Sequence, residues 1–196
     1  MEQKRRIAID DVRFYATCIS LALSHLHNKR VIYRDLKPEN ILLSKDGYAI
    51  LADFGLAKNL GEASSSNSYC GTPEYLCKTS FDFIAPEMIL GSGHDHTLDW
   101  WCLGVLIYEM LVGIPPFYDK NQNKMLERIS RGKIYWPDQQ KHGLTVALDA
   151  QDLISKVSLS DLKLCDKEKA TRLGRNGAQE VLSHPFFSSV NIQGIL

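Results

Sequence analysis

One stretch of this sequence, residues 98–112, is apolar nearly all round, and it constrains the fold more than any other feature. The stretch reads LDWWCLGVLIYEMLV, and its only charged side chains are Asp99 and Glu109. A helix with apolar residues on every face has to be covered on every side by other parts of the chain. The pattern therefore predicts a central buried helix on which the remaining elements of a single domain pack.

The overall composition places the function in local sites rather than in a general surface property. The chain has 196 residues, 44% of them hydrophobic, with 23 Lys and Arg against 23 Asp and Glu. A balanced charge offers no general attraction for nucleic acid. The longest apolar run, Trp100 to Tyr108, is far shorter than the roughly 20 residues that span a bilayer. We therefore expect a soluble, cytoplasmic protein with no nucleic-acid partner and no membrane span.

The remaining periodicities are mostly helical. Val12, Ala16, Ile19 and Leu23 recur at three- and four-residue steps, which predicts a helix over about 10–27. The apolar runs 41–43 and 48–52 flank Ser-Lys-Asp-Gly, a combination typical of a β-hairpin. Further helical patterns cover 121–131, 148–158 and 177–183. One hairpin and several helices predict a mainly α-helical single domain.

Cysteine and histidine spacing argues against a disulfide framework or a structural metal. The five cysteines are scattered without any C-x-x-C pair, so isolated thiols are expected. His94 and His96 flank Asp95 in a Gly-rich stretch that resembles half of a metal site. Because no third ligand stands at helical or hairpin spacing, this stretch is interpreted as a loop.

The residues with the clearest chemistry lie between the first helix and the end of the hairpin. Asp35, Lys37 and Asn40 fall within one short irregular segment, where their side chains can converge. Asp53-Phe54-Gly55 follows the second hairpin strand directly.

With these segments, the chain resembles the large C-terminal lobe of a eukaryotic protein kinase. The further matches, in family order, are Gly71–Leu76, Ala85–Glu87, the helix that contains Asp99, Arg172 and His184–Phe187. Tyr33 in place of the usual His, and Cys70 before Gly-Thr-Pro-Glu-Tyr-Leu, resemble the AGC group of serine/threonine kinases. The resemblance implies a mainly α fold, helical with one small β-hairpin that carries the catalytic and D-F-G loops. It covers residues 1–196 as a partial kinase domain.

By this resemblance, ATP and Mg²⁺ are the expected cofactors and protein Ser/Thr hydroxyls the expected acceptors. Asp35 would accept the proton of the substrate hydroxyl, and Lys37 would place a cation beside the transferred phosphoryl group. Thr72 would bridge these two side chains, although a turn residue before Pro73 is the alternative. Asn40 and Asp53 would provide oxygen ligands for Mg²⁺.

The resemblance also implies residues that bind the nucleotide and the peptide substrate. Leu42 would lie under the adenine ring, and Glu39 would face the ribose or the peptide. Glu74 and Glu109 match positions that contact basic residues upstream of the phosphoacceptor in protein substrates. For Glu39, Glu74 and Glu109 a solvated surface acid is the alternative.

Regulation and internal support follow from the same comparison. Ser68 stands where AGC kinases are phosphorylated by an upstream kinase, with Arg34 and Lys58 as basic partners for the phosphate. An unmodified Ser-rich loop is the alternative. Glu87 and Arg172 would form a structural ion pair, and Asp99 belongs to the structural helix.

The sequence departs from the family pattern in ways that bear on activity. No G-x-G-x-x-G and no strand lysine of the N-terminal lobe stand before Tyr33, so this chain alone is expected to show no appreciable turnover. Within the activation segment, 53–87, an apparent insertion occupies 77–84, and 157–161 also reads as extra. The alternative function is a non-catalytic kinase-like binding module or truncated gene product. In that case the surface around Tyr33, Leu42 and Phe54 would expose apolar area.

Overall fold

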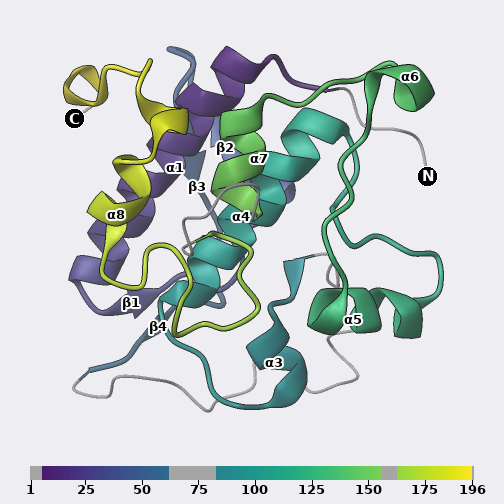
Figure 1. Ribbon diagram of the computed structural model, residues 1–196. Coiled ribbons are helices and arrows are strands. Elements are labelled where there is room, and N and C mark those ends of the chain that lie inside the picture. The colour runs from purple at the N-terminus through teal and green to yellow at the C-terminus, as the bar shows by residue number, and fades with distance from the viewer. Residues whose placement is uncertain (1–5, 62–82, 156–162, 196) are drawn as a thin grey trace.

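The computed structural model describes residues 6–61, 83–155 and 163–195. Helix α4, Thr97–Val112, runs through the middle of the molecule, with α1, Ile9–Asn28, and α7, Leu148–Ile154, packed against it (Figure 1). Every residue of α4 except Met110 is buried. The predicted central buried helix is confirmed.

Helix α1 covers α4 with the apolar face that the sequence predicted. Val12, Ala16, Ile19 and Leu23 are buried. Asp10 and Asp11 occupy the first turn, where negative charge interacts favourably with the positive end of the helix dipole. The packing of α1 on α4 places the loop that follows α1 against the start of α4.

Two small antiparallel sheets flank the loop after α1. Strands β2, Ile41–Leu43, and β3, Ala49–Leu51, form the predicted hairpin, with Ile41 opposite Leu51. Strands β1, Val31–Ile32, and β4, Lys58–Asn59, form a second sheet. The sequence analysis did not predict this sheet, because strands of two residues carry no readable periodicity. It brings the segment after Asp53 back beside the start of the catalytic loop, residues 33–40.

The other elements are short and complete the helical lobe. Helix α7 ends at Ile154, whereas the pattern extended to 158; positions 156–158 lie outside the described residues. The remaining elements are η1, Pro38–Asn40; α3, Pro86–Leu90; α5, Gln122–Arg131; α6, Gln139–His142; α8, Ala178–Leu182; η3, Pro185–Phe187; and η4, Ile192–Gly194. The mainly α fold class is confirmed.

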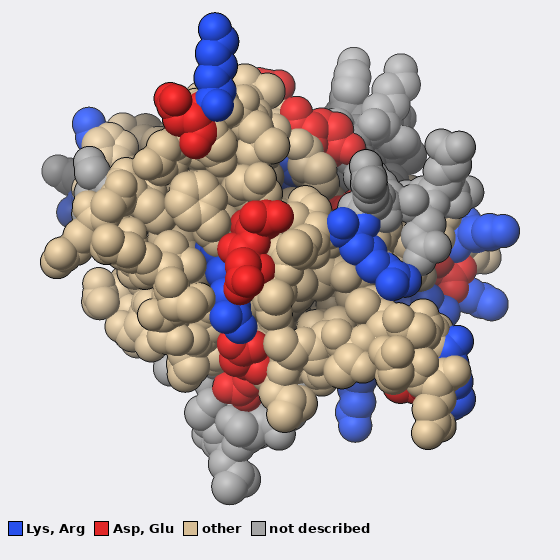
Figure 2. Space-filling model, turned by 90° about the horizontal axis from the view of Figure 1, so that it is seen from above, with Lys and Arg blue, Asp and Glu red and all other residues tan. Residues whose placement is uncertain are grey.

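The distribution of surface charge agrees with the balanced composition, and the described cysteines are isolated thiols, as expected. Figure 2 shows acidic and basic side chains interspersed over one face of the molecule. Cys18, Cys102 and Cys165 are buried free thiols, while Cys70 and Cys77 lie outside the described residues. Within the described ranges, no helix combines the length and apolarity needed to cross a membrane.

Candidate active site

The catalytic loop is anchored to the buried helix α4 through one carboxylate. Asp99 is fully buried, and its Oδ2 accepts the backbone N–H of Tyr33 at 2.9 Å while its Oδ1 accepts that of Arg34 at 2.9 Å. His27, near the end of α1, lies 2.7 Å from Oδ2 through its Nε2. Arg34 adopts a positive φ of 68°, which these contacts hold in place. Asp35 therefore starts from a fixed backbone.

Asp35, Lys37 and Asn40 are joined in one hydrogen-bonded cluster. The Lys37 ammonium donates to both carboxylate oxygens of Asp35, at 2.8 and 2.9 Å. The Asn40 amide nitrogen donates to Asp35 Oδ2 at 2.7 Å and to the Asp35 carbonyl at 2.8 Å. The short helix η1 begins with Pro38, and the backbone N–H of Asn40 donates to the Lys37 carbonyl. This turn brings the side chains of Lys37 and Asn40 to the same Asp35 carboxylate. The charged hydrogen bonds orient the Asp35 side chain.

The D-F-G segment meets this cluster through Tyr33 and the hairpin. The Asn40 carbonyl accepts the backbone N–H of Ala52 at 2.9 Å, so Asp53 follows directly after a residue bonded to Asn40. The Tyr33 hydroxyl donates to the Ala52 carbonyl, and its ring meets Phe54 edge to face at 5.4 Å. Asp53 has a φ of 51° and accepts the N–H of Gly55 at 3.1 Å. The end of strand β3 and the catalytic loop thus lie next to each other.

The electrostatics of Tyr33 show that the acidic groups gather around it. Burial is the largest cause that raises the pKa of Tyr33 to about 12, and the negative charges of Asp35 and Asp53 raise it further. Asp99 adds to the rise, whereas a hydrogen bond with Asn40 opposes it. Asp35 and Asp53 therefore both lie near enough to this buried phenol for their charges to act on it.

The side-chain oxygens of Asn40 and Asp53 are of the chemical type that Mg²⁺ binds. The amide nitrogen of Asn40 bonds to Asp35, which leaves its side-chain oxygen as a neutral ligand, and Asp53 offers an exposed carboxylate. Mg²⁺ in nucleotide sites takes one or two such oxygens and completes its shell with water and phosphates. Over the described residues there is no group of three His, Cys, Asp or Glu side chains that could hold a metal.

The other predicted nucleotide residues lie at the exposed edge of this region. Leu42 is 56% exposed and Phe54 is 51% exposed, and Glu39 is also exposed. The expectation that Tyr33 belongs to the exposed apolar surface was wrong, because Tyr33 is fully buried. Its backbone and hydroxyl both bond inside the fold, which carries the ring into the core between α4 and the D-F-G segment.

Of the proposed regulatory residues, Arg34 and Lys58 are described and Ser68 is not. Arg34 donates through Nε to the Leu56 carbonyl at 2.7 Å, and its NH1 lies 3.4 Å from His94 Nε2. Thr72, Glu74 and positions 77–82 of the apparent insertion also lie outside the described residues. His94 and His27 were missed as members of this region, because nothing in local spacing connects them with Arg34 or Asp99.

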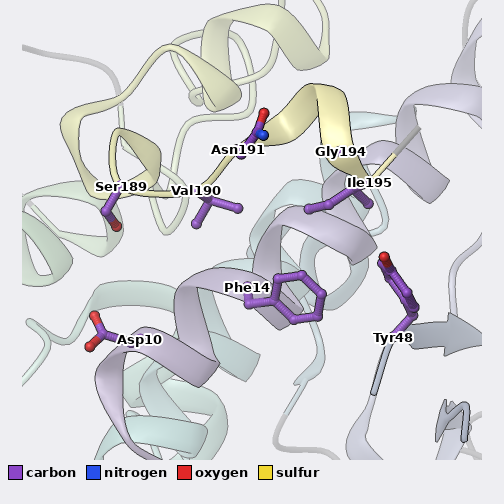
Figure 3. Close-up of a pocket in the computed structure, with 8 residues that line it drawn as sticks. All are labelled: Asp10, Phe14, Tyr48, Ser189, Val190, Asn191, Gly194 and Ile195. Atoms are coloured by element: carbon purple, nitrogen blue, oxygen red, sulfur yellow. The ribbon is translucent and has the colours of Figure 1, made fainter. Parts of the chain in front are cut away.

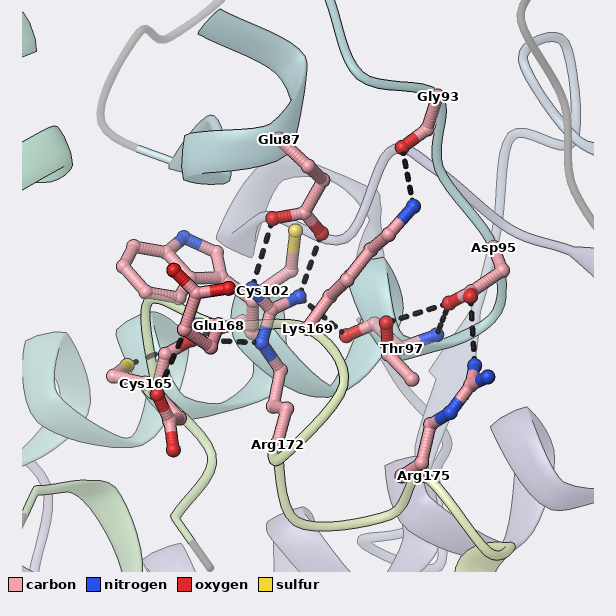
Figure 4. Close-up of polar contacts among 12 residues, drawn as sticks. Glu87, Gly93, Asp95, Thr97, Cys102, Cys165, Glu168, Lys169, Arg172 and Arg175 are labelled. Atoms are coloured by element: carbon pink, nitrogen blue, oxygen red, sulfur yellow. Dashed lines mark hydrogen bonds and ion pairs between the residues drawn. The ribbon is translucent and has the colours of Figure 1, made fainter. Parts of the chain in front are cut away.

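The predicted structural residues Glu87 and Arg172 form a buried two-pronged ion pair (Figure 4). Arg172 donates to the two Glu87 carboxylate oxygens at 2.6 and 2.8 Å, and to the Thr97 carbonyl at 3.1 Å. Arg172 is completely buried and Glu87 is 4% exposed. The pair fastens α3 to the start of α4. Glu109, the proposed substrate residue on α4, is buried at 5% exposure.

A separate pocket lies at the other end of α1. It has a volume of about 580 Å³ and is bounded by Asp10 and Phe14 of α1, Tyr48 of the hairpin turn, and the segment 189–195 (Figure 3). The Phe14 and Tyr48 rings lie 5.5 Å apart. Its lining contains none of the residues of the catalytic loop, so its size does not mark the candidate active site.

Comparison with known proteins identifies the class. The sequence profile described as "Protein kinase domain" matches residues 1–187, and the chain belongs to this family. Members of the family use ATP with Mg²⁺ and phosphorylate proteins.

The relatives that the chain resembles are serine/threonine kinases of AGC type. The chain is 43% identical over its whole length to "Serine/threonine protein kinase ypkA" of Aspergillus fumigatus and covers 28% of that protein. It is 42% identical over its whole length to "Serine/threonine-protein kinase sgk-1" of Caenorhabditis elegans, covering 38%. Over 91% of the chain it is 44% identical to "cAMP-dependent protein kinase catalytic subunit 3" of Drosophila melanogaster, covering 27%. The chain thus spans between a quarter and two fifths of the length of these relatives.

Proposed function

We propose that this chain carries the catalytic lobe of an ATP-dependent protein serine/threonine kinase. The observation that carries the proposal is the cluster in which Lys37 and Asn40 both hold the Asp35 carboxylate, beside the strand end that carries Asp53. Phosphoryl transfer needs positioning and charge neutralisation more than covalent chemistry from the protein. An acid, a cation and two magnesium-type oxygen ligands in one region meet that need.

In the proposed reaction, Asp35 orients the substrate hydroxyl and accepts its proton. Its carboxylate is suited to this role because Lys37 and Asn40 prevent it from rotating. Lys37 also places a positive charge beside the transferring group, where negative charge spreads over the phosphoryl oxygens. Thr72, outside the described residues, is proposed to bridge Asp35 and Lys37.

Asn40 and Asp53 are proposed to hold Mg²⁺ through their side-chain oxygens. When bound, Mg²⁺ neutralises charge on the nucleotide phosphates. Leu42 is proposed to contact the adenine, since its exposed side chain stands at the edge of the same region. Glu39, also exposed, is proposed to face the ribose or the peptide.

The proposed substrates are proteins with basic residues upstream of the acceptor serine or threonine, recognised by Glu74 and Glu109. Regulation is proposed to act through the activation segment, 53–87, with its apparent insertion at 77–84. Phosphorylation of Ser68 by an upstream kinase would place a phosphate on Arg34 and Lys58. Support for this part comes from the position of Arg34, whose guanidinium bonds to the Leu56 carbonyl of that segment.

Magnesium-dependent ATP binding tests the proposed site. We expect ATP to bind the chain more tightly with Mg²⁺ than with EDTA in a calorimetric or NMR titration. Asp53→Asn should reduce the magnesium-dependent part of the affinity by about tenfold or more. Asp46→Asn, which changes an exposed acid in the hairpin turn, is the matched control and should bind like the unmodified chain. Equal affinities with Mg²⁺ and with EDTA would contradict the proposal.

Transfer of labelled phosphate from Mg-ATP to an Arg-containing serine peptide tests the role of Asp35. Because this chain alone is expected to show no appreciable turnover, transfer is measured with the chain joined behind the N-terminal lobe of a related kinase, with and without Asp35→Asn. Asp35→Asn keeps the shape of the side chain but removes the base, so it should lower transfer by at least about a hundredfold. Equal transfer by the two proteins would show that Asp35 is not the base.

The second candidate function is a binding module without catalysis. It is favoured by the exposed side chains on the hairpin, with Leu42 at 56%, Leu43 at 60% and Ile50 at 48% exposure. Apolar residues grouped in this way mark interaction surfaces. A binding module predicts no metal-dependent affinity for ATP, so the same titration separates the two functions.

A further inference from the structure

Basic side chains from two separate segments, Arg34 and His94, are in contact, and the charge of a third, Lys58, acts on the same imidazole. Arg34 belongs to the catalytic loop, Lys58 to β4, and His94 to the loop before α4. The Arg34 NH1 atom lies 3.4 Å from His94 Nε2. Lys58 is near enough for its charge to act on the same imidazole. Arg34 is only partly buried, and its Nε donates to the Leu56 carbonyl on the exposed side.

The contact with Arg34 identifies the protonation state of His94. A guanidinium carries only donors, so the Nε2 atom that faces it acts as an acceptor and the ring is neutral. The electrostatics agree with this geometry. Burial is the largest cause that lowers the pKa of His94, and the positive charges of Arg34 and Lys58 lower it further.

The acidic groups around His94 oppose this effect, but they are already paired with cations. Glu87 of α3 and Asp95 of the same loop both raise the pKa of His94. Glu87 is bound to Arg172 at 2.6 Å and Asp95 to Arg175 at 2.8 Å, which offsets their negative charge. The side of His94 that faces Arg34 is therefore electropositive.

We propose that Arg34, Lys58 and His94 form a proton-linked site for a phosphate-type dianion, in which His94 gains a proton when the anion binds. The inference rests on the proposed function for the assignment of Arg34 and Lys58 as anion partners and adds His94. The proton comes from solvent and is held at Nε2, which then donates to an anion oxygen instead of accepting from Arg34. A phosphoserine of the chain and free phosphate present the same dianion.

The direction of the pH dependence follows from this exchange. A bound dianion favours the charged imidazole, so His94 has a higher pKa in the complex than in the free chain. The affinity is then greatest where His94 is protonated, and it falls as the pH rises. Linkage of one proton limits the fall to about tenfold per pH unit.

Inorganic sulfate is the probe, because it remains a dianion across the pH range of the test, whereas phosphate monoesters change charge near pH 6. Sulfate is titrated into the chain at pH 6.0 and pH 7.5 and followed by NMR of the histidine rings. We expect the dissociation constant to be roughly three- to tenfold lower at pH 6.0. His94→Gln should remove most of this difference. His25→Gln, which changes an exposed histidine of α1, should retain it.

Three results would overturn the proposal. The first is a His94→Gln variant with the full pH dependence of the unmodified chain, and the second is an Arg34→Gln variant that binds sulfate as well as that chain. The third needs no variant: an NMR-measured pKa of the His94 ring that saturating sulfate leaves unchanged. None of these measurements uses ATP or turnover, so failure of magnesium-dependent ATP binding would affect the proposed function alone.

The source of the dianion can be assigned with a chain that carries phosphoserine at position 68. If the phosphoserine occupies the site, the pKa of His94 rises without sulfate and sulfate no longer binds. If free phosphate is the ligand, the modification leaves both values as they were. Either result upholds the site and assigns its source.

Discussion

The carboxylate of Asp99 accepts the backbone N–H of Tyr33 at 2.9 Å, and this bond joins the most deeply buried helix to the residue two places before Asp35. The same carboxylate holds Arg34 at 2.9 Å and His27 at 2.7 Å. A buried carboxylate tolerates its charge only when its oxygens are bonded in this way. Asp99 thus positions the catalytic loop from the core of the protein, and its buried side chain does not reach the surface.

Asp99→Asn should destabilise the chain and loosen the catalytic loop. The amide keeps one acceptor oxygen but turns an N–H₂ group toward a donor, so at least one buried backbone N–H loses its partner. We expect the free energy of unfolding to fall by about 3 kcal/mol. Urea denaturation measures the change, with Asp46→Asn as the exposed control. A loss as small as that of the control would contradict the anchoring role.

The pair of Glu87 and Arg172 should show strong coupling in a double-mutant cycle. Either Glu87→Gln or Arg172→Met leaves a buried charge without its partner, which costs about 3–5 kcal/mol. Arg172→Met should cost more, because Arg172 also donates to the carbonyls of Thr97 and Asp166. The double variant should lose less than the sum of the two. Strict additivity in thermal or urea unfolding would show that the two residues act independently.

The contribution of Lys167 to the stability of the chain should increase in mildly alkaline solution. Its ammonium lies 3.9 Å from the centre of the Phe117 ring and 4.9 Å from that of Trp101. Burial lowers the pKa of Lys167 from 10.5 to about 8. Between pH 8 and 10, Lys167 therefore binds more protons in the unfolded chain than in the folded one, so its own contribution to stability increases with pH. The buried thiols Cys18, Cys102 and Cys165, whose pKa values burial raises, contribute in the opposite direction.

The comparison variant is Lys167→Met, which keeps the apolar stem and removes the titrating group. After allowance for the partial exposure of Lys167, the unmodified chain should gain about 1–2 kcal/mol relative to the variant between pH 8 and 9.5. The comparison with the variant is needed because both proteins contain the buried thiols and the buried tyrosines Tyr33 and Tyr108. Their raised pKa values lower stability as the pH rises, and this effect cancels between the two proteins. Parallel stability curves for the two proteins would refute the assignment.

Gly174→Ala should be much more destabilising than Gly143→Ala. Both glycines have a positive φ, 90° and 60°. A Cβ at Gly174 would lie 2.5 Å from the Trp100 ring, whereas one at Gly143 would meet no atom within 4 Å. The second variant should cost about 1 kcal/mol from backbone strain alone, and the first at least about 3 kcal/mol. Similar losses in urea unfolding would mean that the Trp100 contact is easily relieved.

The parts of the fold that were predictable are those with a local signature. The apolar face of α1, the continuous apolar run of α4 and the Asp-Gly turn of the hairpin each lie within one stretch of chain, so periodicity or turn chemistry reveals them. The sheet of β1 and β4 was not predictable, because its strands pair across the whole D-F-G segment. The candidate site divides in the same way: Asp35, Lys37 and Asn40 are neighbours in sequence, and their convergence was expected from that alone.

The sequence by itself determined the buried helix, its covering helix and the cluster of acid, cation and amide, because each depends on side chains close together along the chain. Only the tertiary structure decided which distant groups support that cluster. His27 meets Asp99 across a separation of 72 residues, and Arg34 meets His94 across 60. Such pairs form because α1 and the catalytic loop pack against the start of α4 and the loop before it, and this buries polar groups that must then find partners. No pattern of residue types along the chain records which partner each group finds.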